Sequence, residues 1–172
     1  MKPKKQIVLP RNITKLDLGD TNHGEGQPLG KNWTSISLEG DKDCGGCECC
    51  KCKGFKYKLK GDYSNMPYKS NSFSYAYGGC FLEFETADTD AKKLKQFKEV
   101  YRVLKKGGTF DVCGCMTAEG VEEIRDLERE VQHYMSLAVK VGFTVSTKWQ
   151  KEMWAGNYNG WTDVPHIMLK KK

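Results

Sequence analysis

Short runs of alternating or mainly apolar residues recur along the chain and predict β-strands. Alternation is typical of strands because successive side chains point to opposite faces of a sheet. The runs occupy residues 13–18, 33–38, 55–60, 73–77, 109–113, 143–149 and 164–169. The sequence therefore predicts a sheet assembled from segments spread over the whole chain.

Two longer segments have the period of a helix instead. In residues 88–104 and 119–141, apolar side chains recur three or four positions apart and form one face of a helix. In the first segment they are Leu94, Phe97, Val100, Tyr101 and Leu104. Both segments connect predicted strands, so we expect two helical crossovers.

The first of these helices is expected to end at a run of two lysines and two glycines. Lys105 and Lys106 are predicted to lie in its last turn, where cations complement the helix dipole. Gly107 and Gly108 are predicted to be its C-terminal stop.

Strands joined by helical crossovers imply a mainly parallel sheet with helices on both faces. The last two strands are joined by residues 150–163, which are rich in Trp, Tyr, Asn and Gly and are expected to form a loop. We therefore expect the final strand to run antiparallel to its neighbour. The first crossover, residues 20–32, contains three glycines and a proline and has room for one helical turn at most. The fold class predicted is α/β, of the Rossmann-like type.

The composition fits one domain over residues 1–172, with 38% hydrophobic and 29% charged residues. The apolar run near the start is shorter than the ~7–15 residues of a signal peptide. No stretch approaches the ~20 apolar residues of a membrane-spanning helix. We expect a cytoplasmic protein without a membrane partner.

The net charge of +6 comes from 28 basic and 22 acidic residues. The excess lysines lie mostly near the termini and in expected loops, as on an ordinary solvated surface. A nucleic-acid partner stays open as a weaker hypothesis, which predicts salt-sensitive binding.

Residues 99–108 read EVYRVLKKGG. They resemble the class I S-adenosylmethionine-dependent methyltransferases, in which E-x-x-R-V-L-K-P-G-G closes the helix before the fifth strand. Asp17 and Gly19 are similar to the "D-x-G" opening of the cofactor loop in that family, and the short first crossover is similar to one sub-branch. The resemblance extends over residues 13–169 and implies a Rossmann-like methyltransferase fold.

The resemblance also implies a binding site for S-adenosylmethionine, beginning at the first two strands. Gly19 would let the backbone pass close to the methionine portion, with Asp17 and Asp20 on either side. Glu39 lies 22 residues beyond Asp17, where the family has its ribose-binding acid, and Asp41 is the substitute. The alternative interpretations are a tight turn at Gly19 and a solvated strand end at Glu39.

Later segments would complete the cofactor site. Asp62 and Tyr63 correspond to the pair that holds the adenine, although Asp62 could instead cap a turn. Tyr77 and Gly78 end the fourth strand beside the reacting centre. No catalytic residue is assigned.

Two functions follow from the resemblance. The first is a methyltransferase that uses S-adenosylmethionine and acts on a small-molecule or macromolecular acceptor of unknown identity. The second is a catalytically inactive methyltransferase-like domain that serves as a binding or metal-carrying module. The second stays open because Gly24 and Gly26 lie further along the loop than the family pattern requires.

A cysteine-rich insertion at residues 40–54 holds five thiols within nine residues. They are Cys44, Cys47, Cys49, Cys50 and Cys52. The density is sufficient for one tetrahedral metal, but the separated second CxxC pair of a zinc ribbon is missing. A metal cluster and a loop of exposed, reduced thiols both remain possible. His23, His133 and His166 are expected to be surface or packing residues.

Four aromatic residues lie in or beside the predicted loop 150–163. They are Trp149, Trp154, Tyr158 and Trp161. They are expected either to line an acceptor pocket or to cover the end of the sheet.

Overall fold

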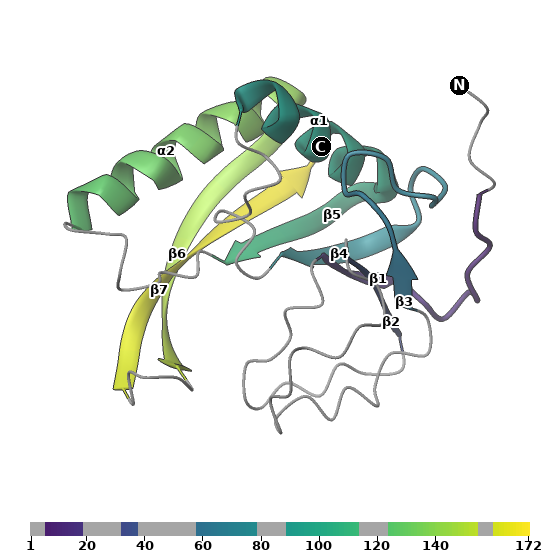
Figure 1. Ribbon diagram of the computed structural model, residues 1–172, viewed down its shortest axis with the longest axis horizontal. Helices are drawn as coiled ribbons and strands as arrows, with labels where there is room; N and C mark the ends of the chain where they lie inside the picture. The colour runs from purple at the N-terminus through teal and green to yellow at the C-terminus, as the bar shows by residue number, and fades with distance from the viewer. Residues whose placement is uncertain (1–5, 19–31, 38–57, 79–88, 114–123, 155–159) are drawn as a thin grey trace.

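The computed structural model describes residues 6–18, 32–37, 58–78, 89–113, 124–154 and 160–172. Seven strands form one sheet, and two helices lie against it (Figure 1). The strands are β1 (Lys15–Leu18), β2 (Trp33–Ser37), β3 (Lys58–Lys60), β4 (Phe73–Gly78), β5 (Leu104–Cys113), β6 (Phe143–Trp154) and β7 (Gly160–Lys171). The helices are α1 (Asp90–Val103) and α2 (Ile124–Val141).

The sheet has the strand order β3-β2-β1-β4-β5-β7-β6. The first five strands in this order are mutually parallel, and β7 runs antiparallel to both β5 and β6. This confirms the predicted mainly parallel sheet with an antiparallel last strand. Both described helices, which are the two that the sequence predicts, cover the same face (Figure 1). Helices on the second face stay a prediction, because the segments that join most of the other strands lie outside the described residues.

Helix α1 ends earlier than the sequence predicts. Its N-cap is Thr89, whose side chain accepts a hydrogen bond from a backbone N–H of the first turn. At the other end, Leu104 is already extended, with φ −71° and ψ 143°. The predicted last turn with Lys105 and Lys106 is therefore wrong, because both lysines belong to β5.

The glycine pair after these lysines shapes the start of β5 rather than the end of the helix. Gly107 has φ +74°, which L-residues rarely adopt. A Cβ on Gly108 would lie 2.8 Å from the Lys105 carbonyl oxygen and 3.2 Å from that of Ser74. The pairing of β4 with β5 shifts register at this point. Glycine thus allows the two strands to approach across an irregular part of the ladder.

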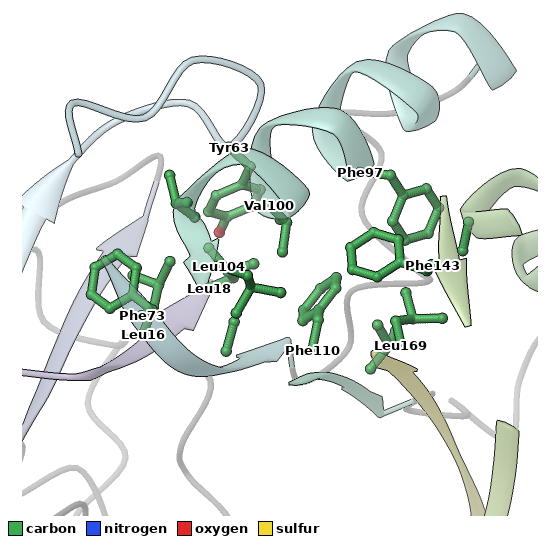
Figure 2. Packing of buried hydrophobic residues seen from close by; sticks show 14 of the residues in the cluster. Leu16, Leu18, Tyr63, Phe73, Phe97, Val100, Leu104, Phe110, Phe143 and Leu169 are labelled. Atoms are coloured by element: carbon green, nitrogen blue, oxygen red, sulfur yellow. The ribbon is translucent and has the colours of Figure 1, made fainter. Parts of the chain in front are cut away.

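The hydrophobic core lies between the sheet and the two helices (Figure 2). Phe97 of α1 packs edge-on against Phe110 of β5 and Tyr134 of α2, with ring centroids 6.5 and 6.3 Å apart. Leu16 and Leu18 of β1 are fully buried. Each such side chain contributes about 1.5–3 kcal/mol through burial.

The last two strands are longer than the sequence predicts. Their pairing is continuous from Phe143 with Lys171 to Trp154 with Gly160. The predicted ends at residues 149 and 164 are therefore wrong, and most of the predicted loop 150–163 is strand. Main-chain hydrogen bonds hold this ribbon, so its side chains need not follow an apolar pattern. It extends beyond the other strands at the lower left of Figure 1.

Candidate functional site at the carboxyl edge of the sheet

A row of polar residues crosses the second face of the sheet, opposite the helices. In the strand register, Asp17 of β1 is paired with Ser35 of β2 on one side and with Tyr77 of β4 on the other. Tyr77 is paired in turn with Asp111 of β5. Alternation places these side chains on the face away from Leu16 and the core. Asp17 is fully buried.

This row lies next to the point where the strand order reverses. The chain proceeds from β1 outward to β2 and β3, then returns to place β4 on the other side of β1. The carboxyl ends of β1 and β4 therefore border a topological switch point, where open parallel sheets bind ligands. The structure places Asp17, Tyr77 and Gly78 there together, and their predicted role in cofactor binding stays a prediction.

The predicted adenine pair lies in the turn after β3. Asp62 accepts hydrogen bonds from the backbone N–H of Ser64 at 2.7 Å and from its hydroxyl at 2.6 Å. The Tyr63 ring is buried in the core, 2% exposed. Asp62 therefore caps its own turn, and Tyr63 anchors that turn to the core.

Other predicted positions lie outside the described residues. They are Gly19, Asp20, Gly24, Gly26, Glu39, Asp41, His23, the cysteine-rich insertion 40–54 and Tyr158. Their assignments stay predictions.

A charged pair on α1 fixes the segment that carries Asp62. The Glu99 carboxylate accepts a hydrogen bond from the Met66 N–H at 2.8 Å. Arg102 donates to the carbonyl oxygens of Tyr68 at 2.8 Å and Met66 at 3.2 Å. The two side chains also bind each other at 2.7 Å, and this hydrogen bond raises the pKa of Arg102. These are the glutamate and arginine of EVYRVLKKGG, so the motif holds the loop before β4.

A second polar network occupies the sheet beside the switch point. Tyr75 of β4 donates a hydrogen bond to Asp111 Oδ2 at 2.6 Å. Asp111 Oδ1 lies 2.8 Å from Nδ1 of His166 in β7. The side chains of His166 and Asp111 are only 4% and 10% exposed. Burial raises the pKa of Tyr75, and the hydrogen bond to Asp111 raises it further.

The sequence offered little sign of this network. His166 is predicted to be a surface or packing residue, and the structure shows it buried in a hydrogen bond with a carboxylate. Its partner is 55 positions away. The available signal was that alternation places Tyr75, Asp111 and His166 on the non-core face of their strands.

Aromatic rings flank the network at the other end of the same face. Trp33 of β2 meets Tyr75 edge-on, with ring centroids 5.8 Å apart. Lys15 Nζ lies 5.3 Å from the Trp33 centroid and 5.8 Å from that of Tyr75. These contacts fix the Tyr75 ring from the side of β1 and β2.

Within the part of the chain that the structure describes, no three His, Cys, Asp or Glu side chains come close enough to hold a metal ion. The five clustered cysteines of residues 40–54 lie outside the described residues. No described helix is both long and apolar enough to cross a membrane.

Comparisons with known proteins agree with this geometry. Residues 29–112 match the family model of the methyltransferase domain. A sterol 24-C-methyltransferase of Neurospora crassa is 34% identical over 89 residues, which are 51% of this chain. The chain spans only 21% of the length of that relative.

Solved structures show the same fold. A methyltransferase of Methanosarcina mazei aligns with a TM-score of 0.58 at 15% identity, over 95% of this chain and 94% of its own. A phosphoethanolamine N-methyltransferase of Haemonchus contortus, in complex with phosphomonomethylethanolamine and S-adenosylhomocysteine, aligns with a TM-score of 0.51 at 15% identity. That alignment covers 92% of this chain and 49% of the other.

Proposed function

Because the chain belongs to the class I S-adenosylmethionine-dependent methyltransferase family, we propose that it transfers a methyl group from S-adenosylmethionine to an acceptor at the carboxyl edge of its sheet. The observation that carries the proposal is the position of Asp17, Tyr77 and Gly78 at the switch point between β1 and β4. This is where a sheet with this strand order binds a nucleoside.

The residues at the switch point suit the family's cofactor. S-adenosylmethionine supplies an electrophilic methyl group on a positively charged sulfur. Asp17 places a buried carboxyl group next to the switch point, and Tyr77 adds an aromatic ring and a hydroxyl. Gly78 has no side chain to obstruct a ligand that approaches the end of β4.

The remaining cofactor contacts are part of the same proposal. Gly19 and Asp20 follow β1 directly and are proposed to pass along the methionine portion. Glu39 is proposed to bind the ribose hydroxyls. Asp62 is proposed to hold the adenine amino group, with the buried Tyr63 ring keeping its turn in place.

The chain assists the transfer by alignment and by exclusion of water. A displacement at a methyl carbon is accelerated when donor and acceptor are held in line at contact distance. Removal of water strengthens the electrostatic interactions around the charged sulfur. The hydrogen bonds from Glu99 and Arg102 to the loop backbone support this role, because they fix the segment that leads from Asp62 into β4.

We include a cytoplasmic location in the proposal. The five clustered cysteines support this location, because a reducing compartment keeps cysteines as thiols or thiolate ligands rather than disulfides. Alkylation of rapidly quenched cells with a thiol reagent would detect eight free thiols in the full chain if this is correct.

Isothermal titration of the purified chain with S-adenosylhomocysteine tests the function. We expect one site per chain, and an affinity about 10-fold lower in Asp17→Asn, because that substitution replaces an oxygen of the buried carboxyl group with an amide donor. Ser35→Ala is the matched control, since Ser35 lies beside Asp17 in the same row; it should bind as the wild type does. No heat at millimolar ligand would overturn the proposal in favour of an inactive binding module.

A further inference from the structure

We propose that the amino edge of the sheet is a docking surface for nucleic acid, which it binds through phosphate groups rather than bases. Basic side chains form this surface, which we call the amino-edge basic surface. Arg102 and Lys171 are its half-buried members. Its exposed members are Lys69, Lys105, Lys106, Lys140, Lys170 and Lys172.

Hydrogen bonds bring three lysine-bearing segments together at this edge. Arg102, near the end of α1, donates to Ser70 Oγ at 3.3 Å, and this contact holds the turn that begins at Lys69. Lys171 Nζ donates to the Leu104 carbonyl oxygen at 2.7 Å, which places the end of β7 beside the start of β5. Figure 1 shows the C-terminus beside α1. Lysines that are far apart in the sequence therefore share one edge of the sheet.

The end of α2 adds a fourth segment. Lys140 lies in its last turn and is exposed. Phe143, which follows the helix after Gly142, packs edge-on against Tyr101 with ring centroids 4.9 Å apart. Phe143 is also paired with Lys171 in the sheet. These contacts place Lys140 on the same edge as the other members of the surface.

Negative charge is scarce in the four segments that form the surface. Their one acidic residue is Glu99, whose carboxylate is bound to Arg102 at 2.7 Å. Burial lowers the pKa of Lys171, and the positive charge of Arg102 lowers it further. The cations of this edge therefore repel one another, and a bound polyanion would relieve the repulsion and release its own counterions. The segments are residues 69–72, 99–109, 138–144 and 169–172.

The side chains between the lysines favour nucleic acid over a lipid bilayer. Of the large apolar residues described as exposed, Val139 is the one within these segments, whereas a helix that binds a bilayer buries a whole apolar face in it. The hydroxyl of Ser70 and the amide of Asn71 lie on an exposed turn beside the lysines. Serine and asparagine side chains commonly contact phosphate oxygens in protein–DNA complexes.

Two of the lysines lie on a projection from the edge. Residues 105–108 stand opposite Ser74 alone in the register of β4 and β5, so they bulge out of the ladder. Lys105, Lys106 and Gly107 are exposed there. A projecting pair of cations can reach between phosphate groups, which a flat arrangement cannot.

The surface lies opposite the proposed cofactor site. Strand β4 begins at Phe73, which is paired with Leu104, and ends at Gly78 beside the switch point. At the rise of a strand, these two ends are about 16 Å apart. Docking of nucleic acid at this edge is therefore independent of the proposed methyl transfer, and each can be tested without the other.

The test measures binding of the full chain to a fluorescein-labelled oligouridine of about 20 nucleotides, by fluorescence anisotropy between 50 and 300 mM KCl. We expect the logarithm of the association constant to fall linearly with the logarithm of the salt concentration, with a slope of about −3 for about four phosphate contacts. In the triple variant Lys105→Gln, Lys106→Gln and Lys170→Gln, the slope should become shallower by about 2. Its affinity at 100 mM KCl should be at least about 10-fold lower.

The matched control loses the same net charge elsewhere, through Lys92→Gln, Lys95→Gln and Lys148→Gln. These lysines are exposed on α1 and β6, away from the amino edge, and the control should bind the RNA within about twofold of wild type. Circular dichroism checks that both triple variants fold.

Three results would overturn the proposal. They are no binding by the wild type at 50 mM KCl, an equal loss of affinity in the two triple variants, and tighter binding to phosphatidylserine vesicles than to the RNA. Failure of the wild type to bind S-adenosylhomocysteine would remove the proposed function and leave this surface unaffected.

Discussion

Arg102 Nη2 lies 2.7 Å from Glu99 Oε1, and the same carboxylate oxygen accepts the backbone N–H of Met66 at 2.8 Å. Glu99 and Arg102 lie one turn apart on α1. They bind the backbone of the loop that leads into β4, with Glu99 as the acceptor and Arg102 as the donor. Side chains that bind a loop backbone replace hydrogen bonds the loop would otherwise make with water. The family motif thus has a structural role in this chain.

Arg102→Ala should destabilise the protein by about 2 kcal/mol. The variant leaves the Met66 and Tyr68 carbonyl oxygens and the Glu99 carboxylate without this donor. Urea unfolding followed by circular dichroism measures the loss. Arg102→Lys should recover only part of it, because an ammonium group cannot reproduce the planar fork.

The control for this series is Lys98→Ala. Lys98 is exposed on the same helix, and its removal should change the free energy of unfolding by less than about 0.5 kcal/mol. Equal stabilities of Arg102→Ala and Lys98→Ala would show that the fold does not depend on the hydrogen bonds between Arg102 and the loop before β4.

Gly107→Ala and Gly108→Ala should both destabilise the chain, for different reasons. At Gly107 the space is open but φ is +74°, so the cost is the ~1–2 kcal/mol of a left-handed backbone. At Gly108 the new methyl group would collide with backbone oxygens of residues 105, 74 and 73, and about 3 kcal/mol or more is expected. Gly107→Asn should be milder than Gly107→Ala, because asparagine tolerates this backbone. A milder Gly108→Ala than Gly107→Ala would contradict this description of β5.

Lys171 should stabilise the junction between α1 and β5. Its Nζ donates to the carbonyl oxygens of Leu104 at 2.7 Å and Tyr101 at 2.8 Å, and to Asn71 Oδ1 at 3.0 Å. The carbonyl groups at a helix end have no partner within the helix. Lys171→Met should lower Tm by ~3–6 °C, equivalent to about 1–2 kcal/mol. Lys172→Met is the exposed control, and an equal Tm for the two variants would refute the capping role.

Alkaline pH should unfold the protein partly through Tyr68. Burial raises the pKa of this phenol to about 12, against 10.0 for a free tyrosine. The folded state therefore disfavours the tyrosinate. The contribution is fully present below pH 10 and is lost as the pH rises through 12. Two pKa units correspond to about 3 kcal/mol.

Tyr68→Phe tests this assignment. The variant should show a shallower fall of unfolding free energy between pH 10 and 12, measured by urea titration at each pH. It should also lose a small amount of stability at neutral pH, because Thr34 loses the hydroxyl 3.5 Å away. A variant with the wild-type slope would show that other groups govern alkaline unfolding.

The sequence predicted the order of elements well because local patterns determine it. The apolar period of residues 88–104 and the alternation at Leu16 and Leu18 each reflect a surface that one element buries. The end of α1 was misplaced because Gly107 and Gly108 serve strand pairing, and a sequence pattern does not distinguish that role from a helix stop. The length of β6 and β7 was underestimated because main-chain hydrogen bonds pair these strands, and such bonds leave no apolar pattern in the sequence.

The candidate site was predictable only where a strand end defines it. Asp17, Tyr77 and Gly78 could be placed because parallel strands end on one edge. The contact of Asp111 with His166 could not, because it depends on which strand inserts next to β5. That choice is made by tertiary pairing between segments 55 positions apart.

A crystal structure of the chain with S-adenosylhomocysteine would show where the nucleoside binds. We expect its density between the carboxyl ends of β1 and β4, against Asp17 and Gly78, with the sulfur toward the end of β5. Density at another edge of the sheet, or crystals that remain free of ligand at millimolar concentration, would contradict it.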